Sequence, residues 1–379
     1  MVTVYLIRHA EAEGNLYRRG QGQFDGRVTP RGRLQIAALA ERFRDVPLDA
    51  LYSSDLSRTV ETAGAILKYH DLPLVTDRRL REINMGCWED VSWGNLAHEN
   101  KVMIDNFSSD PDNWHVPGGE RFQLVAARMA EAVEEIAAGH EEQSAAVVSH
   151  GMAIRALLCR YLNVPSREVM RVPHGDNTAV SLLRFENGRA EVVYINDNSH
   201  LDESISPFMR QTWWREKCGT EDNNLRFEPL DLALEGDFYT DCYRDAWRVS
   251  HGSDFGFEPS LYLASARLHA EANPQALMKA YRGGSLAGLV ELDTLRGRDR
   301  GFGWITLCYM LPEHRDQGLG VQLIGHALSV FRNLGRKSVR LHVSVGNGRA
   351  RRFYERYEFR ELGREAGVAG ETVLMEKTI

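Results

Sequence analysis

A short apolar run near the start of the chain, Val4–Ile7, ends directly in a cation and an imidazole. The run is partly β-branched and too short for a helix, so we predict a buried strand. Arg8 and His9 follow at its carboxyl end, which is where open α/β sheets bind ligands. A guanidinium can hold phosphate bidentately and a neutral imidazole can attack phosphorus, so the segment indicates phosphate chemistry. The alternative interpretation is a strand that simply ends in a solvated loop.

Strand-like and helical segments alternate through the rest of the first half. Short apolar strands are predicted over residues 48–52 and 145–148. A helix is predicted to begin at Pro30, with Thr29 as its N-cap. Its inward positions are expected to be Leu34, Ala37, Ala38 and Phe43. Strands that alternate with helices predict an α/β domain with a mostly parallel sheet that is covered on both faces.

His150 and Arg58 lie at matching places in this pattern. His150 follows the strand at 145–148, as His9 follows the first strand. Arg58 lies in the first turn of the helix after the strand at 48–52, so its side chain can lean back toward the strand ends. A lone histidine is more often structural, but two histidines at equivalent strand ends, with arginines to match, are hard to explain as core residues. We therefore predict that these side chains share one anion site.

Several spaced motifs in this half resemble one known family. They are Leu6–Asn15, Ser53–Thr62, Leu80–Glu89 and Val147–Leu158, with the later Asn177-Thr178 pair and the segment Ile195–Leu201. In this order the motifs resemble the histidine phosphatase superfamily, which has the phosphoglycerate-mutase-like fold. The resemblance covers about residues 1–200 and implies a three-layer α/β/α domain over residues 1–201.

The resemblance implies a role for each matching side chain. His9 would attack phosphorus and become a phosphohistidine. Glu82 would protonate the leaving oxygen and then activate water, unless it is only a solvated acid in a loop. The phosphoryl oxygens would be held by Arg8, Asn15, Arg58 and His150. No cofactor and no metal are implied for this domain.

Two residues depart from the family pattern. Ala10 stands where the family usually has glycine, and Asp90 stands where glycine commonly follows the Trp-Glu pair. Neither change removes a reacting group. The segment at 80–89 resembles the phosphatase branch more than the mutase branch, so hydrolysis is predicted in preference to internal phosphate transfer.

The chain becomes polar and irregular over residues 202–224, where we predict a linker. Further on, an R-x-x-G-x-G segment stands directly before a helix with one apolar face. Glycines ahead of a helix let backbone N–H groups close on a pyrophosphate, aided by the positive end of the helix. The residues of this segment are Arg315, Gln317, Gly318 and Gly320. On its own, such a loop is often only a turn.

The surroundings of that loop resemble the GNAT superfamily of acetyltransferases. A strand ends near Met310, and the glycine loop, a helix, a strand at 339–345, Asn347 and an A-x-x-F-Y-E helix follow. The resemblance covers about residues 225–379 and implies an α+β domain that uses acetyl-CoA. The glycine loop would bind the pyrophosphate, Met310 the pantetheine through its backbone, and Asn347 a further part of the cofactor. Tyr354 would protonate the departing thiolate.

Three features of the second half stay open. Tyr354 also fits a packing residue, because aromatic residues recur around it at helical intervals. Glu358 stands where the family usually has glycine. No motif assigns a general base: Glu291 or Asp293 could deprotonate an amine through water, or either could be a surface carboxylate.

Composition limits the class of protein and of partner. The formal charge of −7 over 379 residues argues against a nucleic-acid or membrane-surface role, because such surfaces are basic. The five cysteines are scattered and form no CxxC pair, which predicts reduced core thiols in a cytoplasmic protein instead of disulfides or a zinc site. The first residues suit a strand and no apolar run approaches membrane-spanning length, so neither a signal peptide nor a membrane segment is expected.

We therefore predict a bifunctional enzyme. Its first domain would hydrolyse a small phosphomonoester through a phosphohistidine, and its second would transfer acetyl from acetyl-CoA to a small amine. Two alternatives stay open: mutase-type phosphate transfer in the first domain, and a sensor that binds a phospho-ligand and CoA without turnover. The sequence leaves the oligomeric state open, a homo-oligomer included.

Overall fold

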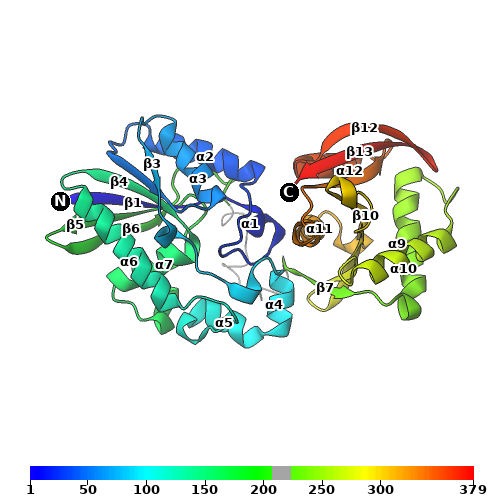
Figure 1. Cartoon of the computed structure of the whole chain (residues 1–379), viewed down its shortest axis with the longest axis horizontal. Coiled ribbons are helices and arrows are strands. Elements are labelled where there is room, and N and C mark those ends of the chain that lie inside the picture. Colours follow the sequence, from blue (N-terminus) through cyan, green and yellow to red (C-terminus); the bar gives the residue numbers. More distant parts are fainter. Residues whose placement is uncertain (207–222) are drawn as a thin grey trace. The chain divides into compact units, whose positions relative to one another are not determined.

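The structure is a computed structural model that describes residues 1–206 and 223–379. The chain forms two compact units, and Ser92–Asn95 are the part of the first half that groups with the second unit. The linker predicted over residues 202–224 falls largely outside the described residues, so its limits stay a prediction. Each unit has its own sheet, as Figure 1 shows.

The first unit contains a six-stranded sheet in the order β3-β2-β4-β1-β5-β6. Its strands are β1 Val2–Arg8, β2 Ala50–Ser53, β3 Leu74–Thr76, β4 Ser144–Ser149, β5 Val180–Glu186 and β6 Arg189–Asp197. Strands β1, β2, β3 and β4 run parallel to one another, while β5 and β6 pair antiparallel. This confirms the mostly parallel sheet that the alternating pattern predicts, and it adds a hairpin at one edge.

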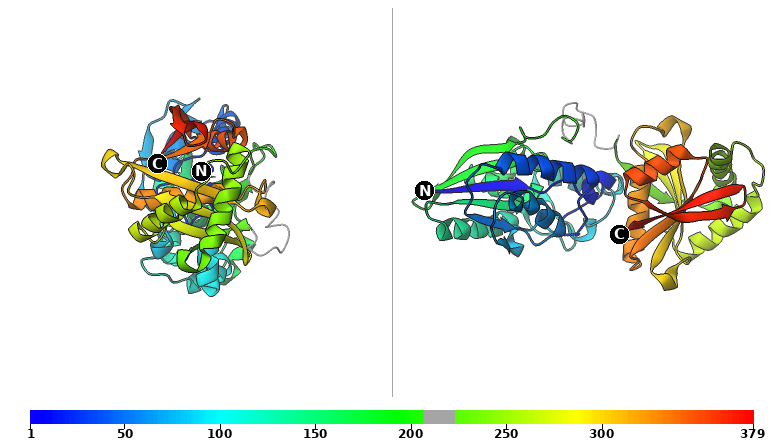
Figure 2. Two further views of the ribbon diagram at one scale, coloured as in Figure 1. Left: turned by 90° about the vertical axis from the view of Figure 1, so that its right-hand side faces the viewer. Right: turned by 90° about the horizontal axis from the view of Figure 1, so that it is seen from above.

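Helices cover both faces of this sheet, which makes the first unit a three-layer α/β/α domain (Figures 1 and 2). Helices α2 and α3 pack together on one face, and α6 and α7 pack together on the other. The α-helices are α1 Glu13–Tyr17, α2 Pro30–Phe43, α3 Ser57–Leu67, α4 Trp93–Glu99, α5 Lys101–Ser109, α6 Phe122–Gly139 and α7 Gly151–Tyr161. The longer 3₁₀ segments lie between them at Arg78–Leu80, Gly86–Trp88, Pro111–Asn113 and Ser166–Arg171.

Helix α2 begins where the sequence predicts, but it turns a different face inward. The Thr29 hydroxyl accepts a hydrogen bond from a main-chain N–H at 3.0 Å and caps the helix. Leu34 is 58% exposed, whereas the polar Gln35 is fully buried. The predicted inward positions are therefore wrong at Leu34 and Ala37, which is also exposed, and right at Phe43.

The register of the two central strands fixes the position of the candidate site. Arg8 is paired with Ser149 at the end of the parallel pair β1–β4. Parallel strands that end at the same level present their following residues side by side. His9 follows β1 and His150 follows β4, so both histidines emerge at one edge of the sheet.

The second unit is an α+β fold with a seven-stranded, mostly antiparallel sheet in the order β12-β13-β11-β10-β9-β8-β7. Its strands are β7 Leu225–Pro229, β8 Leu277–Arg282, β9 Ser285–Asp293, β10 Phe302–Met310, β11 Ser338–Ser344, β12 Arg360–Gly367 and β13 Gly370–Thr378. Its helices are α9 Leu232–His251, α10 Pro259–Ala272, α11 Val321–Asn333 and α12 Gly348–Arg356. Helices α9 and α10 pack on one face of the sheet, and α11 packs on β9, β10 and β11 from the other.

Strands β10 and β11 of this sheet run parallel and pair only where they begin. Phe302–Trp304 pair with Ser338–Arg340. Beyond these residues β10 pairs with β9 and β11 pairs with β13, with a register shift in β10 between Ile305 and Leu307. Within the described part of the chain, the carboxyl half of β10 therefore has an unpaired main-chain edge on the side of β11.

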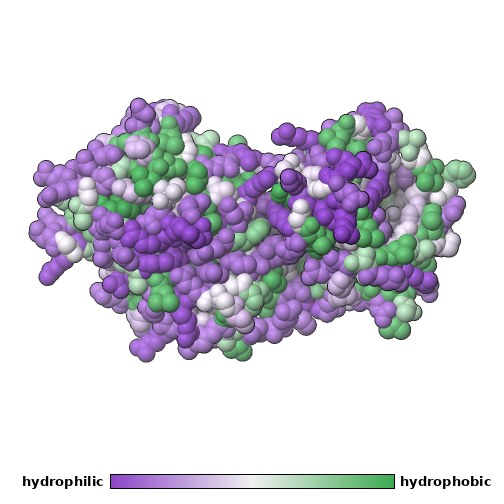
Figure 3. All heavy atoms as spheres, viewed as in Figure 1, coloured by the Kyte–Doolittle hydropathy of each residue, from purple (hydrophilic) through white to green (hydrophobic). Residues whose placement is uncertain are grey.

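Hydrophilic residues cover most of the face of each unit that Figure 3 shows. Among the described residues, no helix combines the length and apolar character that crossing a bilayer requires. Of the predicted core thiols, Cys159 and Cys242 are buried and Cys308 is partly buried. Cys87 is exposed, so the prediction is wrong there, and Cys218 lies outside the described residues.

Candidate active site

His9 is a buried, neutral imidazole with a fixed proton position. Its side chain follows β1, is 4% exposed, and places Nδ1 2.7 Å from the carbonyl oxygen of Ala10. A carbonyl can only accept, so Nδ1 carries the proton and Nε2 keeps its lone pair. Burial, followed by the charges of Arg58 and Arg8, holds the pKa of His9 well below its usual value. The ring can therefore act as a nucleophile at neutral pH.

His150 lies beside His9 at the end of the neighbouring strand. The two ring centroids are 5.2 Å apart. His150 is fully buried at the N-cap of α7, and its Nε2 lies 2.9 Å from the hydroxyl oxygen of Ser54. Burial, then the positive charge of Arg58, lowers the pKa of His150 well below its usual value. This ring too is neutral at pH 7.

Arg58 and Arg8 bring two guanidinium groups to the same place. Arg58 is fully buried and donates to the carbonyl oxygens of Phe24 at 2.8 Å and Gly22 at 2.6 Å. Arg8 donates to the carbonyl oxygen of Gly175. Burial lowers the pKa of Arg58 to about 10, so the group stays charged at neutral pH. Both guanidiniums are held by neutral carbonyls, which leaves their positive charge available to a substrate.

Three buried nitrogens in this group make no hydrogen bond within the described residues: Arg8 Nε, Arg58 Nε and His150 Nδ1. A buried donor without a partner costs free energy, typically about 1–3 kcal/mol, unless a ligand satisfies it. Three such nitrogens around the neutral His9 ring, in a region of positive charge, suit an anion with several oxygens. The arrangement can bind a phosphoryl group and stabilise charge that develops on it.

Glu82 follows the 3₁₀ segment Arg78–Leu80 and places its carboxylate at the N-terminus of α7, the helix that His150 caps. It is 8% exposed and accepts hydrogen bonds from the N–H groups of Met152 at 2.9 Å and Ala153 at 2.8 Å. Burial raises the pKa of Glu82, although these N–H donors act in the opposite direction. A carboxyl group whose pKa is raised toward neutrality can both donate and accept a proton. Glu82 is therefore not the solvated loop acid of the alternative interpretation.

Asn15 lies at the first turn of α1, close to the main chain of His9. Its side-chain oxygen accepts from the N–H of Ala12 at 3.1 Å. The side-chain amide of Asn177 donates to the His9 carbonyl at 3.0 Å and lies 3.5 Å from the Asn15 oxygen. Asn15 is thus part of the local structure around the nucleophile, and its contact with phosphate stays a prediction.

The two departures from the family pattern are accommodated without loss of a reacting group. Ala10 is fully buried, and its N–H donates to the hydroxyl of Thr62 at 2.9 Å. Asp90 has φ of 56°, the left-handed conformation for which glycine is the usual residue. Its carboxylate pairs with Arg19, with 2.7 Å between Oδ1 and Nε. A short acidic side chain tolerates this backbone better than most residues do.

Sequence reasoning missed Glu89, which organises the loop that holds Arg58. Its carboxylate accepts from the N–H groups of Gly22 at 3.1 Å, Gln23 at 2.7 Å and Phe24 at 2.9 Å. Two carbonyls of the same loop bind Arg58, so Glu89 acts on the anion site through the main chain. The sequence feature that could have pointed to Glu89 is its place in the Trp-Glu pair of the motif at 80–89. A lone acid at that place does not by itself indicate a role in the site. Ser54, the partner of His150, was missed in the same way.

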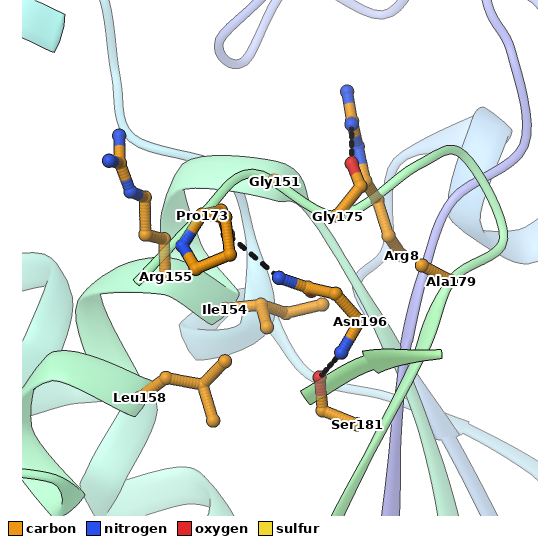
Figure 4. Close-up of a pocket in the computed structure, with 10 residues that line it drawn as sticks. All are labelled: Arg8, Gly151, Ile154, Arg155, Leu158, Pro173, Gly175, Ala179, Ser181 and Asn196. Carbon is orange, nitrogen blue, oxygen red and sulfur yellow. Dashed lines mark hydrogen bonds between the residues drawn. The ribbon is translucent and has the colours of Figure 1, made fainter. Parts of the chain in front are cut away.

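Gly151 allows the close approach of Arg8 to α7. A Cβ atom at Gly151 would lie 3.2 Å from Arg8 Nε and 3.3 Å from Cζ. Figure 4 shows both residues on the wall of a small pocket between α7 and the β5–β6 hairpin. The polar groups that Figure 4 joins by dashed lines bond to one another: the Asn196 side-chain amide donates to the Pro173 carbonyl at 2.7 Å, and the Asn196 main-chain N–H donates to the Ser181 hydroxyl at 3.0 Å. The pocket therefore borders the Arg8 side chain.

Tyr354 of the second unit is 8% exposed, on α12. The thiol of Cys308 on β10, the strand with the unpaired edge, is close enough to act on the pKa of this hydroxyl. Burial, then Cys308, raises the pKa of Tyr354 well above its usual value, so the hydroxyl keeps its proton. The geometry fits both a proton donor in the gap between β10 and β11 and a packed tyrosine.

The glycine loop before α11 presents main-chain donors. The N–H groups of residues 316–321 make no hydrogen bond within the described part of the chain. Gly318 has φ of 74°, and a Cβ atom there would meet open space. Consecutive free N–H groups at the start of a helix, here one of 13 residues, can bind a phosphate-bearing ligand.

The other predicted cofactor residues already make bonds within the unit. Asn347 caps α12 by accepting from Ala350 N–H at 3.0 Å, and its amide donates to the Ser250 hydroxyl at 3.3 Å. Arg315 donates to the Met310 carbonyl at 2.9 Å and also pairs with Asp245. The Gln317 side chain is exposed and bonds to the Glu313 carbonyl at 2.7 Å. These contacts position the loop, and direct contact of these side chains with a cofactor stays a prediction.

Glu291 is not a surface carboxylate. It is fully buried and accepts from the hydroxyl of Tyr239 at 2.9 Å and from His269 Nδ1 at 2.7 Å. The other ring nitrogen of His269 lies 3.5 Å from Asp293. Burial alone would lower the pKa of His269, but Glu291 and Asp293 raise it overall. Both candidate bases are therefore engaged with one histidine of α10.

The sequence matches the histidine phosphatase superfamily (branch 1) over residues 4–198 and the acetyltransferase (GNAT) family over residues 237–359. Probable phosphoglycerate mutase GpmB of Erwinia tasmaniensis is 32% identical over 219 residues, which are 58% of this chain and 93% of that protein. Phosphoserine phosphatase 1 of Hydrogenobacter thermophilus is 31% identical over 203 residues, which are 54% of this chain and 96% of that protein.

Among solved structures, Bacillus stearothermophilus YhfR is 32% identical with a TM-score of 0.51, and the match covers 53% of this chain and 99% of that one. These matches fall on the unit that carries the paired histidines and arginines. The chain therefore belongs to the histidine phosphatase superfamily, and its second half carries a domain of the GNAT acetyltransferase family.

Proposed function

We propose that the first domain hydrolyses a small phosphomonoester through a phosphohistidine on His9. The observation that carries the proposal is the neutral His9 ring beside buried donors that have no partner within the described residues. A nucleophile with its lone pair free and a positively charged oxyanion site are what phosphoryl transfer needs.

Two steps follow from the positions of the groups. In the first, His9 Nε2 attacks phosphorus, the P–O bond to the leaving group breaks, and the leaving oxygen takes a proton from Glu82. In the second, the Glu82 carboxylate takes a proton from water, the new hydroxyl attacks phosphorus, and the P–N bond breaks. Arg8, Arg58 and His150 stabilise the equatorial oxygens in both steps. The ring and the acid return to their starting states.

Hydrolysis is proposed over mutase-type transfer because the segment at 80–89 resembles the phosphatase branch. One of the similar proteins is a phosphoserine phosphatase and another is a probable phosphoglycerate mutase. The similar proteins therefore include both reaction types, and an experiment has to separate hydrolysis from transfer. Analysis of the products of a phosphorylated hydroxy acid separates them. Release of inorganic phosphate supports hydrolysis, and an isomerised phosphoester supports the mutase alternative.

A phosphodonor that labels the full-length protein tests the first proposal. We expect an acid-labile phosphoryl group on His9 and none on the variant His9→Ala, with hydrolysis lowered by at least about 1,000-fold. His140→Ala is the matched control, because that ring is bonded to Tyr52 and Gln143 away from the anion site. Unchanged hydrolysis in His9→Ala contradicts the proposal, and binding without hydrolysis in the native protein supports a sensor.

We further propose that the second domain transfers acetyl from acetyl-CoA to a small amine. The free N–H groups of residues 316–321 would bind the pyrophosphate, the open edge of β10 near Met310 the pantetheine, and Tyr354 would protonate the CoA thiolate. Arg315, Gln317, Gly318, Gly320 and Asn347 would form and support the cofactor loop. No general base is proposed.

Calorimetric titration with acetyl-CoA tests the second proposal. We expect the substitution Gly318→Glu to abolish binding, because it places a negative charge and a side chain where phosphate would lie. Gly335→Glu is the matched control, since Gly335 also has a left-handed backbone, with φ of 69°, and open space around its Cβ position. Equal binding by Gly318→Glu and Gly335→Glu contradicts the proposed loop site.

A further inference from the structure

We propose that Ser54 is a positioning residue that fixes the tautomer of His150, so that His150 presents an N–H donor to the phosphoryl oxygens. The inference rests on the proposed phosphatase function of the first domain. Ser54 is not itself a reacting group, and its hydroxyl acts on the substrate only through His150.

The contact between the two side chains is buried and directional. Ser54 and His150 are both fully buried, and 2.9 Å separates the hydroxyl oxygen from His150 Nε2. The N–H of Leu56 points to the same hydroxyl oxygen at 3.4 Å. Within the described residues, His150 Nε2 is the one acceptor within reach of the Ser54 hydroxyl proton. The hydroxyl therefore donates to Nε2, and Nε2 is unprotonated.

The second ring nitrogen of His150 then carries the proton. His150 Nδ1 is buried and has no partner within the described residues. Arg58 and Arg8 are close enough to act electrostatically on the ring and, after burial, lower its pKa, so the ring is neutral and holds a single proton. In the opposite tautomer a lone pair would face the phosphoryl oxygens and repel them. The position of one proton thus decides whether this ring attracts or repels the substrate.

His9 and His150 form a complementary pair under this assignment. His9 uses its Nδ1–H on the Ala10 carbonyl and presents the lone pair of Nε2. His150 uses the lone pair of Nε2 on Ser54 and presents Nδ1–H. Two neutral imidazoles 5.2 Å apart therefore offer one nucleophile and one donor to the same phosphoryl group.

Nitrogen NMR of the full-length protein, labelled with ¹⁵N in its histidine rings, reads the tautomer directly. We expect the His150 signals of the native protein to show a protonated Nδ1 and an unprotonated Nε2, and the Nδ1 proton to shift when inorganic phosphate is added. In Ser54→Ala we expect the proton to move partly or wholly to Nε2. A native His150 protonated at Nε2 overturns the proposal.

Ser53→Ala is the matched control for this measurement. Ser53 is the adjacent residue, is equally buried, and donates to the Ser54 carbonyl at 2.8 Å instead of to an imidazole. We expect Ser53→Ala to keep the native tautomer even where it lowers stability. A tautomer change of the same size in both variants overturns the proposal, because it traces the effect to packing.

Kinetics with an aryl phosphate give a second readout. We expect Ser54→Ala to lower kcat by roughly 10- to 100-fold with little change in KM, less than the ~100- to 1,000-fold typical for removal of an oxyanion donor. Ser54→Cys, a near-isosteric weak donor, should recover part of the loss. If the native protein hydrolyses nothing, the phosphatase function fails, while the NMR tautomer and its response to phosphate still decide the role of Ser54.

Discussion

The two candidate sites differ in which part of the chain would meet the substrate. In the first domain it is side chains: Arg8, Arg58 and His150 hold buried nitrogens that have no partner in the described part of the chain. In the second domain it is mainly the backbone, through the N–H groups of residues 316–321 and the open edge of β10. One site depends on the identity of single residues, and the other on the path of the main chain.

This difference also appears in how the nearby side chains are used. In the second domain, the side-chain oxygen and the amide of Asn347 both form hydrogen bonds within the protein, and so does the Arg315 guanidinium. Asn347 therefore stabilises the start of α12, and Arg315 stabilises the loop before α11. In the first domain, Glu89 holds the main chain of Gly22 and Phe24. The carbonyls of those two residues in turn fix the orientation of the charged Arg58 guanidinium. Substitution of one side chain should therefore affect the first site more than the second.

Arg58→Lys tests the role of side chains in the first domain and has the largest expected effect. Lysine is a point charge and cannot reproduce two bonds to carbonyls together with a third donor toward phosphate. We expect kcat for phosphomonoester hydrolysis to fall roughly 100- to 1,000-fold. The measurement is steady-state hydrolysis by protein whose folding has been checked by circular dichroism.

Arg81→Lys provides the comparison for that variant. The Arg81 guanidinium donates through Nε and Nη2 to the carboxylate of Asp55 and through Nη1 to the side-chain oxygen of Gln23, so its donors are bonded within the protein. We expect hydrolysis by Arg81→Lys to stay within about threefold of the native rate. If Arg58→Lys and Arg81→Lys lose activity equally, the description of Arg58 as the oriented phosphate donor is wrong.

Tyr354→Phe tests whether the second domain depends on any single side chain. A general acid contributes about 100-fold or more to the rate, and burial keeps this hydroxyl protonated by raising its pKa. We expect about a 100-fold loss of acetyl transfer with unchanged affinity for acetyl-CoA. Tyr357→Phe, at the residue that directly follows α12, should keep its activity. An active Tyr354→Phe would make Tyr354 a packing residue.

The pH dependence of stability should also separate the two domains. In the first domain, His174 accepts a hydrogen bond from Arg155 at 2.8 Å and His200 lies 3.2 Å from Arg42, so protonation of either ring is unfavourable. Burial, then the neighbouring arginine, lowers the pKa of His174 to about 3 and that of His200 to about 4. The unfolded chain therefore binds more protons than the folded one below pH 6.5, and stability falls as the pH decreases from 6.5.

Each of these histidines should cost on the order of 1 kcal/mol of unfolding free energy between pH 7.5 and 5.5. In the second domain, the raised pKa of His269 acts with the opposite sign: its contribution is present at low pH and is lost as the pH rises through its folded value. The lowered pKa values of His251 and His342 offset part of that gain. Hydrogen exchange on the full chain at both pH values should show the larger loss of protection in the first domain, and an equal loss in both would contradict this.

The first site could be predicted from the sequence because its chemistry lies in side chains at strand ends. A parallel sheet brings the carboxyl ends of its strands to one edge, so His9, His150 and Arg8 had to meet once the strands were recognised. Arg58 joins them from the first turn of α3. The second site was harder to predict, because free N–H groups and a gap between strands belong to the main chain. No particular type of side chain marks them in the sequence.

What the sequence could not reveal are polar residues that are buried to satisfy distant main-chain groups. Gln35 is fully buried because it bonds to Glu11 N–H at 2.8 Å and to the Ile205 carbonyl at 2.8 Å. Hydrophobic periodicity assigns such a residue to the surface, which is why Leu34 was placed inward by mistake. Ser54 could not be predicted from the sequence either, because its hydrogen-bond partner, the His150 side chain, is 96 residues away.

The smallest expected effects come from the two acids that stand where the families usually have glycine. Asp90 in the first domain has φ of 56°, and Glu358 in the second has φ of 67°. Each pairs with a cation: Asp90 with Arg19 at 2.7 Å, and Glu358 with Lys377 at 3.1 Å. Glycine at either position would relieve the backbone strain and remove the ion pair. The net change in the free energy of unfolding therefore depends on whether the relief of strain or the loss of the ion pair is larger.

We expect Asp90→Gly to lower the unfolding free energy by about 1–2 kcal/mol, because aspartate tolerates the left-handed backbone and a charge-assisted bond is lost between two side chains that are both largely shielded, at 10% exposed for Arg19 and 13% for Asp90. Glu358→Gly should stay within about 1 kcal/mol of the native value, because glutamate is more strained there and its carboxylate is 36% exposed, although its partner Lys377 is only 6% exposed. Urea unfolding of each variant measures both changes. A larger loss for Glu358→Gly than for Asp90→Gly would mean that the ion pair with Lys377, and not the backbone, decides the residue at this turn of the second domain.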